Sequence, residues 1–181
     1  MKIFFLVSFY LFLFVPGLFC QRTAQPVVYN FRDSNTFTVL SFKEIKSNFY
    51  FFDSSCINAA LSTAEIALVE RLFGKGITDY NKKIKNQANA SPKSAKEKKE
   101  LMDDFSIPYT DSTYIKQLIP VIDKKNQKRV YINCVAVDLH YKDDYWRKKF
   151  ILIMDGGNSS FQVILNITTE TIEYVGINGF G

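Results

Sequence analysis

The spacing of apolar residues changes near residue 113 of this 181-residue chain, and that change limits what the chain can fold into. Over residues 62–86, apolar side chains recur at intervals of three or four, which predicts one amphipathic helix. From residue 114 onward they recur at every second position in short runs, which predicts strands. The two kinds of element must pack against each other, because neither can bury its apolar face alone.

The predicted helix has a start signal in Ser62 and Glu65, which have the spacing of a capping box. Its apolar stripe is formed by Ile66, Val69, Phe73, Ile77, Tyr80 and Ile84. Gly74 and Gly76 lie within the same segment, and each lowers helix propensity by about 1 kcal/mol relative to Ala. These two glycines predict that the helix bends or divides in two.

Short apolar runs with hairpin-length connections predict an antiparallel meander in the second half of the chain. The runs are residues 114–122, 129–137, 149–154, 161–167 and 171–177. Within the fourth run, Phe161, Val163 and Leu165 alternate with Gln162 and Asn166, so the first set should face the core and the second should lean toward solvent or a shallower layer.

Three β-rich runs before the helix, residues 27–31, 36–40 and 48–52, predict further short strands. The chain as a whole therefore predicts an α+β fold, with a long helix in the N-terminal half packed on a C-terminal antiparallel β-meander. This arrangement looks like the cystatin-like or NTF2-like folds. The helix stripe should meet apolar side chains of the sheet, namely Ile132, Leu152, Val163 and Leu165.

The position of the loops follows from the number of strands. In a meander of five strands, successive connections alternate between the two ends of the sheet. The loop at residues 138–147 should therefore lie at the same end as the 168–170 turn. The Asp155–Asn158 turn should lie at the opposite end, with the 123–128 turn.

The N-terminus has the layout of a signal peptide, with Lys2, an apolar run of 13 residues from Ile3 to Val15, and a Pro-Gly break. A membrane-spanning helix needs about 20 apolar residues, so no transmembrane anchor is expected. We predict a signal peptide at residues 1–20 and a single domain at residues 21–181. A lipid anchor on Cys20 is the less favoured alternative, because Phe19 precedes it where bacterial lipoproteins carry a small residue.

Export would leave Cys56 and Cys134, which permit one disulfide or, equally, two buried thiols. With a single histidine and no paired-cysteine motif, the sequence predicts no metal site and no cofactor. Cys134 lies in a strand and His140 in the loop beyond it, which offers no activating arrangement for a cysteine hydrolase.

Residues 86–100 are rich in lysine and predict a solvated loop or a short surface helix. No aromatic residue stands among these lysines to stack on a base, and the net charge of the chain is only +5. We therefore expect no binding of nucleic acid.

A pattern of turn, aromatic and amide residues extends over residues 114–179. It consists of Tyr114, Gln117 and Pro120, then Trp146, Asp155-Gly156-Gly157-Asn158 with Phe161, Asn166 with Thr168 and Thr169, and Asn178-Gly179. This pattern resembles that of small exported bacterial proteins of unknown function, and Asp79-Tyr80-Asn81 extends the likeness to the helix. The resemblance implies export and a bacterial source, and it carries no activity.

The loop at residues 138–147 holds Tyr141, Tyr145 and Trp146 among mixed charges, a composition typical of recognition surfaces. We predict a non-enzymatic binding or interaction module, secreted or periplasmic, whose partner is an unknown protein or small-molecule ligand of the cell envelope. The alternative function is a small-ligand pocket, or a hydrolase with a carboxylate site, between helix and sheet. A purely structural role, in which Tyr145 and Trp146 plug the open end of the sheet, also stays open. The sequence does not predict the oligomeric state.

Overall fold

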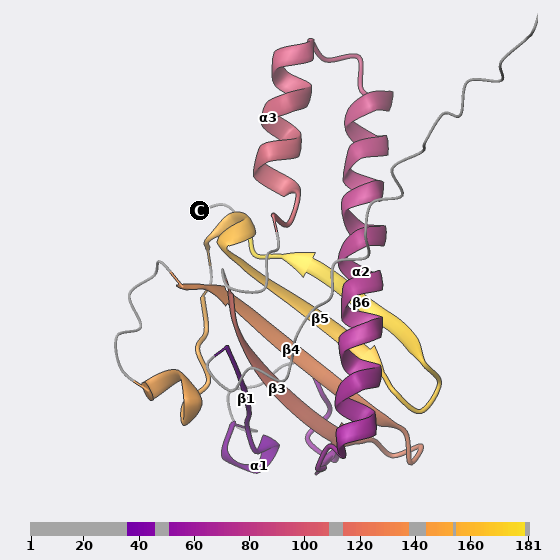
Figure 1. The fold of residues 1–181 in the computed structure, drawn as a ribbon, viewed down its shortest axis with the longest axis vertical. Helices are drawn as coiled ribbons and strands as arrows, with labels where there is room; N and C mark the ends of the chain where they lie inside the picture. Colours follow the sequence, from indigo (N-terminus) through magenta and orange to yellow (C-terminus); the bar gives the residue numbers. More distant parts are fainter. Residues whose placement is uncertain (1–35, 46–50, 109–113, 138–143, 154, 180–181) are drawn as a thin grey trace, which may run out of the picture.

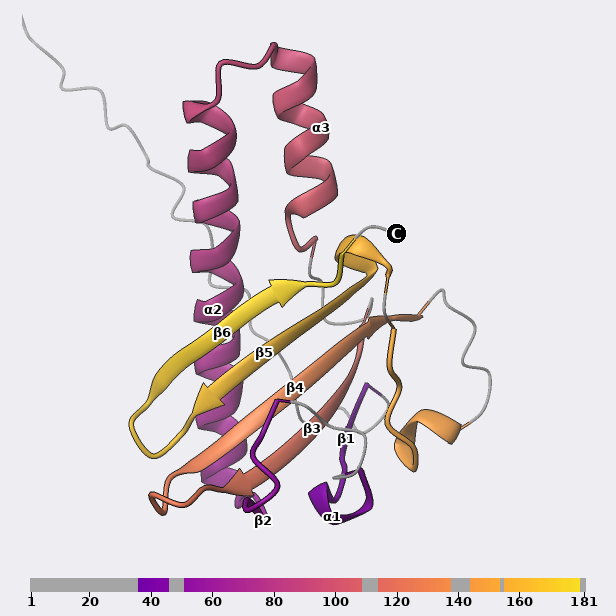
Figure 2. The ribbon, with the colours of Figure 1, turned by 180° about the vertical axis from the view of Figure 1, so that it is seen from behind.

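The computed structural model describes residues 36–45, 51–108, 114–137, 144–153 and 155–179 (Figure 1). Its sheet lies between the long helix on one face and irregular segments on the other (Figures 1 and 2). The predicted α+β arrangement of a long helix on an antiparallel meander is confirmed. The elements in chain order are β1 (Phe37–Val39), α1 (Phe42–Ile45), β2 (Ile57–Asn58), α2 (Thr63–Ala90), α3 (Ala95–Phe105), β3 (Tyr114–Ile122), β4 (Lys128–Ala136), η3 (Asp144–Arg147), η4 (Gly157–Ser159), β5 (Ser160–Asn166) and β6 (Thr171–Ile177).

Helix α2 begins at the predicted capping box. The Glu65 amide donates to Ser62 Oγ at 3.3 Å, and the Ser62 amide donates to Glu65 Oε2 at 2.8 Å. The predicted division of the helix at Gly74 and Gly76 is wrong, because α2 is one helix of 28 residues. Packing explains the tolerance at Gly76: a Cβ there would lie 3.2 Å from Val175 Cγ2, so the glycine lets the helix approach β6 closely.

The sheet has the order β1-β3-β4-β5-β6, and β2 pairs with β3 beside this path. Strands β3 to β6 form an antiparallel meander in sequence order. Strand β1 lies within the predicted 36–40 run but pairs parallel to β3, which the sequence analysis did not anticipate. The predicted 27–31 run and residues 48–50 lie outside the described residues, and residues 51 and 52 form a bend rather than a strand.

The prediction of a strand at 149–154 is wrong for the described residues 149–153, which are irregular. Their backbone bonds to side chains of the sheet rather than to a neighbouring strand: the Ile151 amide donates to Gln117 Oε1 and its carbonyl accepts from Asn133 Nδ2. The meander of β3 to β6 therefore has four strands, and one long connection from 137 to 159 joins β4 to β5.

The loss of one strand also reverses the predicted positions of the loops. The 167–170 turn lies beside the start of β4, where the Lys128 amide donates to Thr168 Oγ1 at 2.8 Å. Residues 144–147 and the Asp155–Asn158 segment both belong to the connection that leaves the other end of β4. For the described residues 144–147, the prediction that the 138–147 loop shares an end with the 168–170 turn is therefore wrong, and residues 138–143 lie outside the described residues.

The face of the sheet under α2 is the larger apolar core. It joins the stripe of α2 to Ile132, Val163 and Leu165, as predicted, and the rings of Phe73 and Phe161 stack with centroids 6.2 Å apart. Leu152 does not take part, because it belongs to the irregular segment and is 58% exposed.

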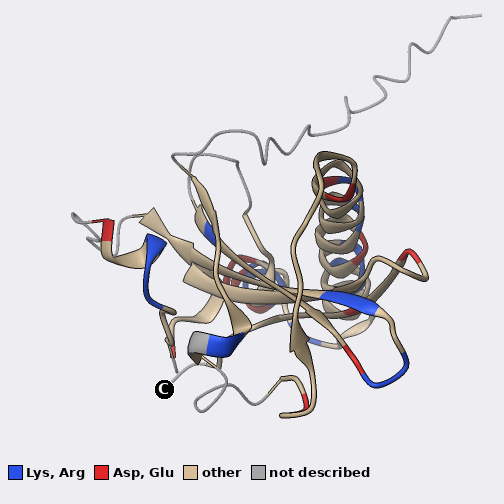
Figure 3. Ribbon diagram, turned by 90° about the horizontal axis from the view of Figure 1, so that it is seen from below, with Lys and Arg blue, Asp and Glu red and all other residues tan. Residues whose placement is uncertain are grey.

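The second face of the sheet is also buried, which corrects the prediction that Gln162 and Asn166 lean toward solvent. Their exposed fractions are 6% and 3%. The apolar side chains of Leu40, Phe42, Ile45, Phe52 and Cys56 cover one part of this face, and Trp146 with Ile151 covers another. Charged residues lie mainly on the helices and in the connections between strands, as Figure 3 shows.

Candidate functional site

A groove of about 540 Å³ lies between α2 and the edge strand β6. Its floor is apolar and consists of Leu72 and Gly76 from the helix and of Ile172 and Val175 from the strand. Because β6 is the last strand in the sheet order, the floor opens to solvent at the sheet edge. A groove of this size with an apolar floor is typical of sites for small ligands.

The rim of the groove carries charges of both signs. Lys75 and Asp79 form an ion pair one helical turn apart, and Arg71 Nη2 lies 2.6 Å from Glu170 Oε2. Lys83 also lines the groove and forms no ion pair within the described part of the chain. The rim therefore offers one lysine whose charge is not already neutralised by a carboxylate.

Tyr80 brings a hydroxyl group to the same groove. Burial raises the pKa of Tyr80, with a smaller effect in the same direction from Tyr174. The phenol therefore stays protonated at neutral pH and can donate or accept a hydrogen bond. Both carboxylates of the rim, Asp79 and Glu170, are exposed and held in ion pairs, whereas a general acid usually has a buried carboxyl group. The arrangement is suited to binding rather than to proton transfer.

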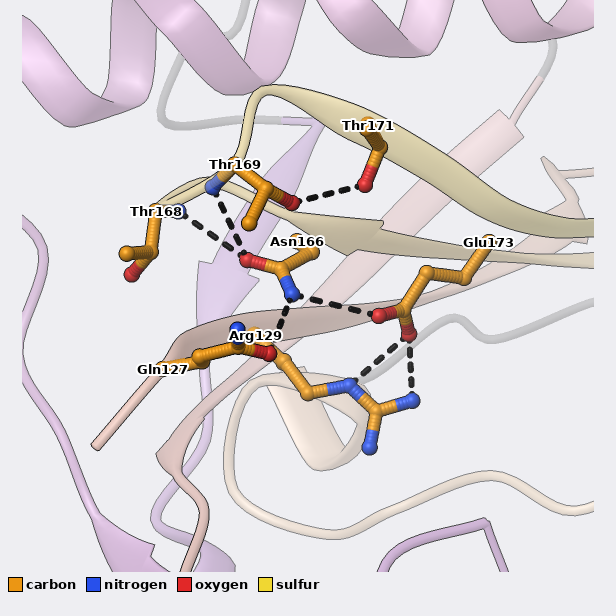
Figure 4. Close-up of polar contacts among 7 residues, drawn as sticks. All are labelled: Gln127, Arg129, Asn166, Thr168, Thr169, Thr171 and Glu173. Atoms are coloured by element: carbon orange, nitrogen blue, oxygen red, sulfur yellow. Dashed lines mark hydrogen bonds and ion pairs between the residues drawn. The ribbon is translucent and has the colours of Figure 1, made fainter. Parts of the chain in front are cut away.

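A second polar cluster lies on the other face of the sheet, at the ends of β4 and β5 (Figure 4). Asn166 is its centre: its Nδ2 donates to Gln127 Oε1 at 2.9 Å and to Glu173 Oε1 at 3.3 Å. Its Oδ1 accepts from the amides of Thr168 and Thr169, both at 3.1 Å. Every polar atom of Asn166 is thus used to hold the turn before β4 to the turn before β6.

Arg129 completes this cluster. Its Nε donates to Glu173 Oε2 at 2.8 Å (Figure 4). Its guanidinium lies 5.0 Å from the centre of the Phe52 ring. A guanidinium over an aromatic face is stabilised by the ring quadrupole. These contacts tie residues 51–56 to the sheet, so we assign the cluster a structural role.

Three buried amides form a row across the second face, because Gln117, Asn133 and Gln162 are opposite one another on β3, β4 and β5. Gln117 Nε2 donates to the carbonyls of Trp146 and Lys149 at 2.6 and 2.7 Å. The 146–151 segment does not pair with a neighbouring strand, so hydrogen bonds from these buried amides hold its backbone in place. The row therefore determines where the 146–151 segment lies.

The structure separates the aromatic residues that the sequence analysis grouped as a binding surface. Trp146 is only 5% exposed and packs with Ile115, Val135 and Ile151, and the Arg147 guanidinium lies 4.3 Å from the centre of its ring. Tyr145 is 58% exposed, and Tyr141 lies outside the described residues. Trp146 thus has the place expected of a structural plug, and Tyr145 is available at the surface.

A small-ligand pocket between helix and sheet was the alternative prediction, but the sequence did not identify its lining as a site, because these residues come from distant parts of the chain. The signal that could have found them is the charged pattern of Lys75, Asp79 and Lys83 along one side of the helix. The resemblance at Asp79-Tyr80-Asn81 also includes two residues that line the groove, Asp79 and Tyr80. Asn81 itself points elsewhere, since it pairs with the backbone amide and carbonyl of Ile107, both at 2.9 Å.

The two cysteines are free thiols in separate cores, Cys134 under α2 and Cys56 on the second face. Burial raises the pKa of Cys134 far above its ordinary value, and burial is also the main cause of the raised pKa of Cys56. Both thiols are therefore protonated at neutral pH and are poor nucleophiles.

Within the described ranges, no group of three or more His, Cys, Asp or Glu residues could hold a metal ion. Among the described helices, none combines the length and the apolar character that crossing a membrane requires. Comparison with known proteins gives no relative: no family model, no curated protein and no solved structure matches the chain. The resemblances that the sequence suggested therefore stay predictions.

Proposed function

We propose that this protein is a non-enzymatic binding module of the cell envelope and that its ligand lies in the groove between α2 and β6. The observation that carries this proposal is the open apolar floor of Leu72, Ile172 and Val175 beside the unneutralised Lys83. An amphiphile with an apolar body and one anionic group suits this combination, because the body would cover the floor and the anion would meet the lysine. Export is supported by the layout of residues 1–20.

The test uses 8-anilinonaphthalene-1-sulfonate, a small anionic amphiphile, in titration calorimetry with the full chain. Asp79→Trp should weaken binding at least about ten-fold, because an indole at this rim position fills the groove. Lys85→Trp is the matched control, since Lys85 is exposed on the same helix and does not line the groove. Equal affinities of both variants and the unmodified chain would rule out the groove as the site.

Tyr145 supports a second contact surface in the predicted recognition loop, because it is a large aromatic residue left exposed. The test of this surface replaces Tyr141 and Tyr145 by Ala and leaves the buried Trp146 in place, so that the sheet stays covered. A loss of partners in a pull-down from the cell envelope would favour this surface. Unchanged capture would exclude it.

A further inference from the structure

The far half of α2 and the whole of α3 project beyond the sheet as a two-helix hairpin (Figures 1 and 2). The hairpin is fixed at its base by the two hydrogen bonds between Asn81 and Ile107. Within it, Ile84 and Ala88 are buried, and Lys98 Nζ donates to the Asn89 carbonyl at 3.3 Å. A second capping box, Ser94 with Glu97, starts α3. These contacts make the hairpin an ordered projection.

The end of this projection, residues 82–99, concentrates the positive charge of the protein. We call it the hairpin tip. It carries seven lysines against one glutamate, a net charge of +6, while the whole chain has a net charge of +5. The rest of the chain is therefore close to neutral. The lysines of the tip are Lys82, Lys83, Lys85, Lys93, Lys96, Lys98 and Lys99.

The carboxylates of α3 neutralise part of this charge: residues 82–105 together carry seven lysines against Glu97, Glu100, Asp103 and Asp104, a net charge of +3. Lys99 pairs with Asp103 at 2.6 Å and Lys96 with Glu100 at 3.8 Å, both on the exposed surface of α3. Lys82 and Lys85 are exposed and form no ion pair within the described residues. An excess of like charge on one projection gives repulsion among its members. An anionic partner outside the protein would relieve that repulsion.

The chemistry of the tip favours a lipid surface over a nucleic acid. All its cations are lysines, which act as point charges, whereas bidentate recognition of phosphates and bases uses arginine. It also has no aromatic residue for a base to stack on. Clusters of four to eight basic residues on a helix are typical of proteins that bind anionic lipids. A projecting tip can also meet a flat surface without obstruction from the sheet domain.

We infer that the hairpin tip docks this protein on a bilayer surface rich in anionic phospholipid headgroups. The contact is electrostatic and peripheral, since the exposed side chains of the tip are polar or small and none of its large apolar residues is free to insert. Lys83 belongs both to the tip and to the rim of the groove, so the inference is tested with lysines of the tip that do not line the groove.

The test is flotation of the full chain with vesicles of phosphatidylglycerol and phosphatidylcholine, compared with vesicles of phosphatidylcholine alone. Any contribution of the apolar N-terminal run appears with both kinds of vesicle, so the difference between them reports the tip. The tip variant replaces Lys85, Lys93, Lys96 and Lys98 by Gln. The matched control removes four exposed lysines elsewhere, replacing Lys43, Lys125, Lys148 and Lys149 by Gln, so both variants lose the same charge.

The unmodified chain should float with the anionic vesicles, and raising the salt concentration should release it. The tip variant should bind them at least about ten-fold more weakly, and the control should stay within about two-fold of the unmodified chain. Circular dichroism verifies that both variants are folded. Equal losses in the two variants would overturn the inference in favour of net charge alone. Tighter binding to a DNA duplex than to the vesicles at the same salt concentration would overturn it in favour of nucleic acid.

Discussion

One face of the sheet is covered by the single helix α2 and its apolar side chains, whereas the other is covered by irregular segments held by buried amides. On the first face, burial itself decides the packing, because apolar contact has no preferred direction. On the second face, a displaced segment would leave amide and carbonyl groups without partners. The first face should thus tolerate small shifts, and the second should tolerate few.

The largest expected effect tests the face under α2. Phe73 is fully buried and stacks on Phe161, so Phe73→Ala should lower the free energy of unfolding by about 3 to 5 kcal/mol through cavity formation. Urea titration measures the change. Leu152→Ala serves as the control and should cost less than about 0.5 kcal/mol, since Leu152 is exposed. Similar losses in both variants would contradict the assignment of this core.

The next effect tests the amide row. Gln117→Leu removes the partners of the Trp146 and Lys149 carbonyls and of the Ile151 amide, and should cost about 2 to 3 kcal/mol. Trp146 is the only tryptophan, so its fluorescence reports the same segment and should shift to the red as the segment loosens. Gln87→Leu changes an exposed amide on α2 and should leave the spectrum as it is. An unshifted spectrum in the Gln117 variant would show that the amides do not position the segment.

A smaller loss should follow from Gln162→Ala. The amide of Gln162 donates to Asn178 Oδ1 at 2.6 Å, so the change leaves a half-buried acceptor without this partner. We expect a loss of about 1 to 2 kcal/mol in urea titration. If the Gln162 side chain pointed to solvent, its removal would lower the free energy of unfolding by less than about 0.5 kcal/mol. Such a value would contradict the buried position of Gln162 and support the outward position that the sequence pattern predicted.

The smallest effect concerns the ion pair that joins the start of α2 to β4. Glu65 Oε1 lies 2.5 Å from Lys128 Nζ, and this lysine, followed by the Ser62 amide, holds the pKa of the Glu65 carboxyl below its ordinary value of 4.5. A carboxyl whose pKa is lowered by folding stabilises the fold above that ordinary value, and this contribution is lost as the pH falls through the folded-state pKa.

Glu65→Gln should therefore cost up to about 1 kcal/mol at neutral pH, while glutamine can keep the capping hydrogen bond. The difference from the unmodified chain should vanish in acid, below the folded-state pKa. Thermal unfolding across the pH range measures it. A gap that persists in acid would mean that the variant loses the cap rather than the charge.

The two faces also differ in how far sequence could predict them. The stripe of α2 and the alternation in β3 to β6 were readable because each apolar residue keeps its period, so their partners under the helix followed. Ile151 and Ile153 are apolar as well, but their segment lacks a strand partner. Its place depends on Gln117 and Asn133, whose burial no local pattern reveals. The strand predicted at 149–154 and the outward position of Gln162 were wrong for this reason.

The candidate site was less predictable than the fold. Its walls come from residues 72–83 and 170–175, and only the packing of α2 on β6 joins them. Trp146 drew attention as the only tryptophan, yet composition does not distinguish an exposed aromatic residue from one that covers a sheet. The parallel pairing of β1 with β3 could not be predicted, since the sequence of a three-residue strand does not show which strand it pairs with or in which direction.

Because α2 contacts β6 closely at Gly76, a small tilt of the helix at this residue moves its far end by a larger distance. The helix touches β6 near its midpoint at this residue, and its far end carries the hairpin tip. Ala90 lies about 20 Å from Gly76 along the helix axis, so a tilt of about 5° at the contact displaces that end by about 2 Å. A ligand that tilted α2 at Gly76 would therefore move the lysines at the far end of the helix further than it moves the contact itself.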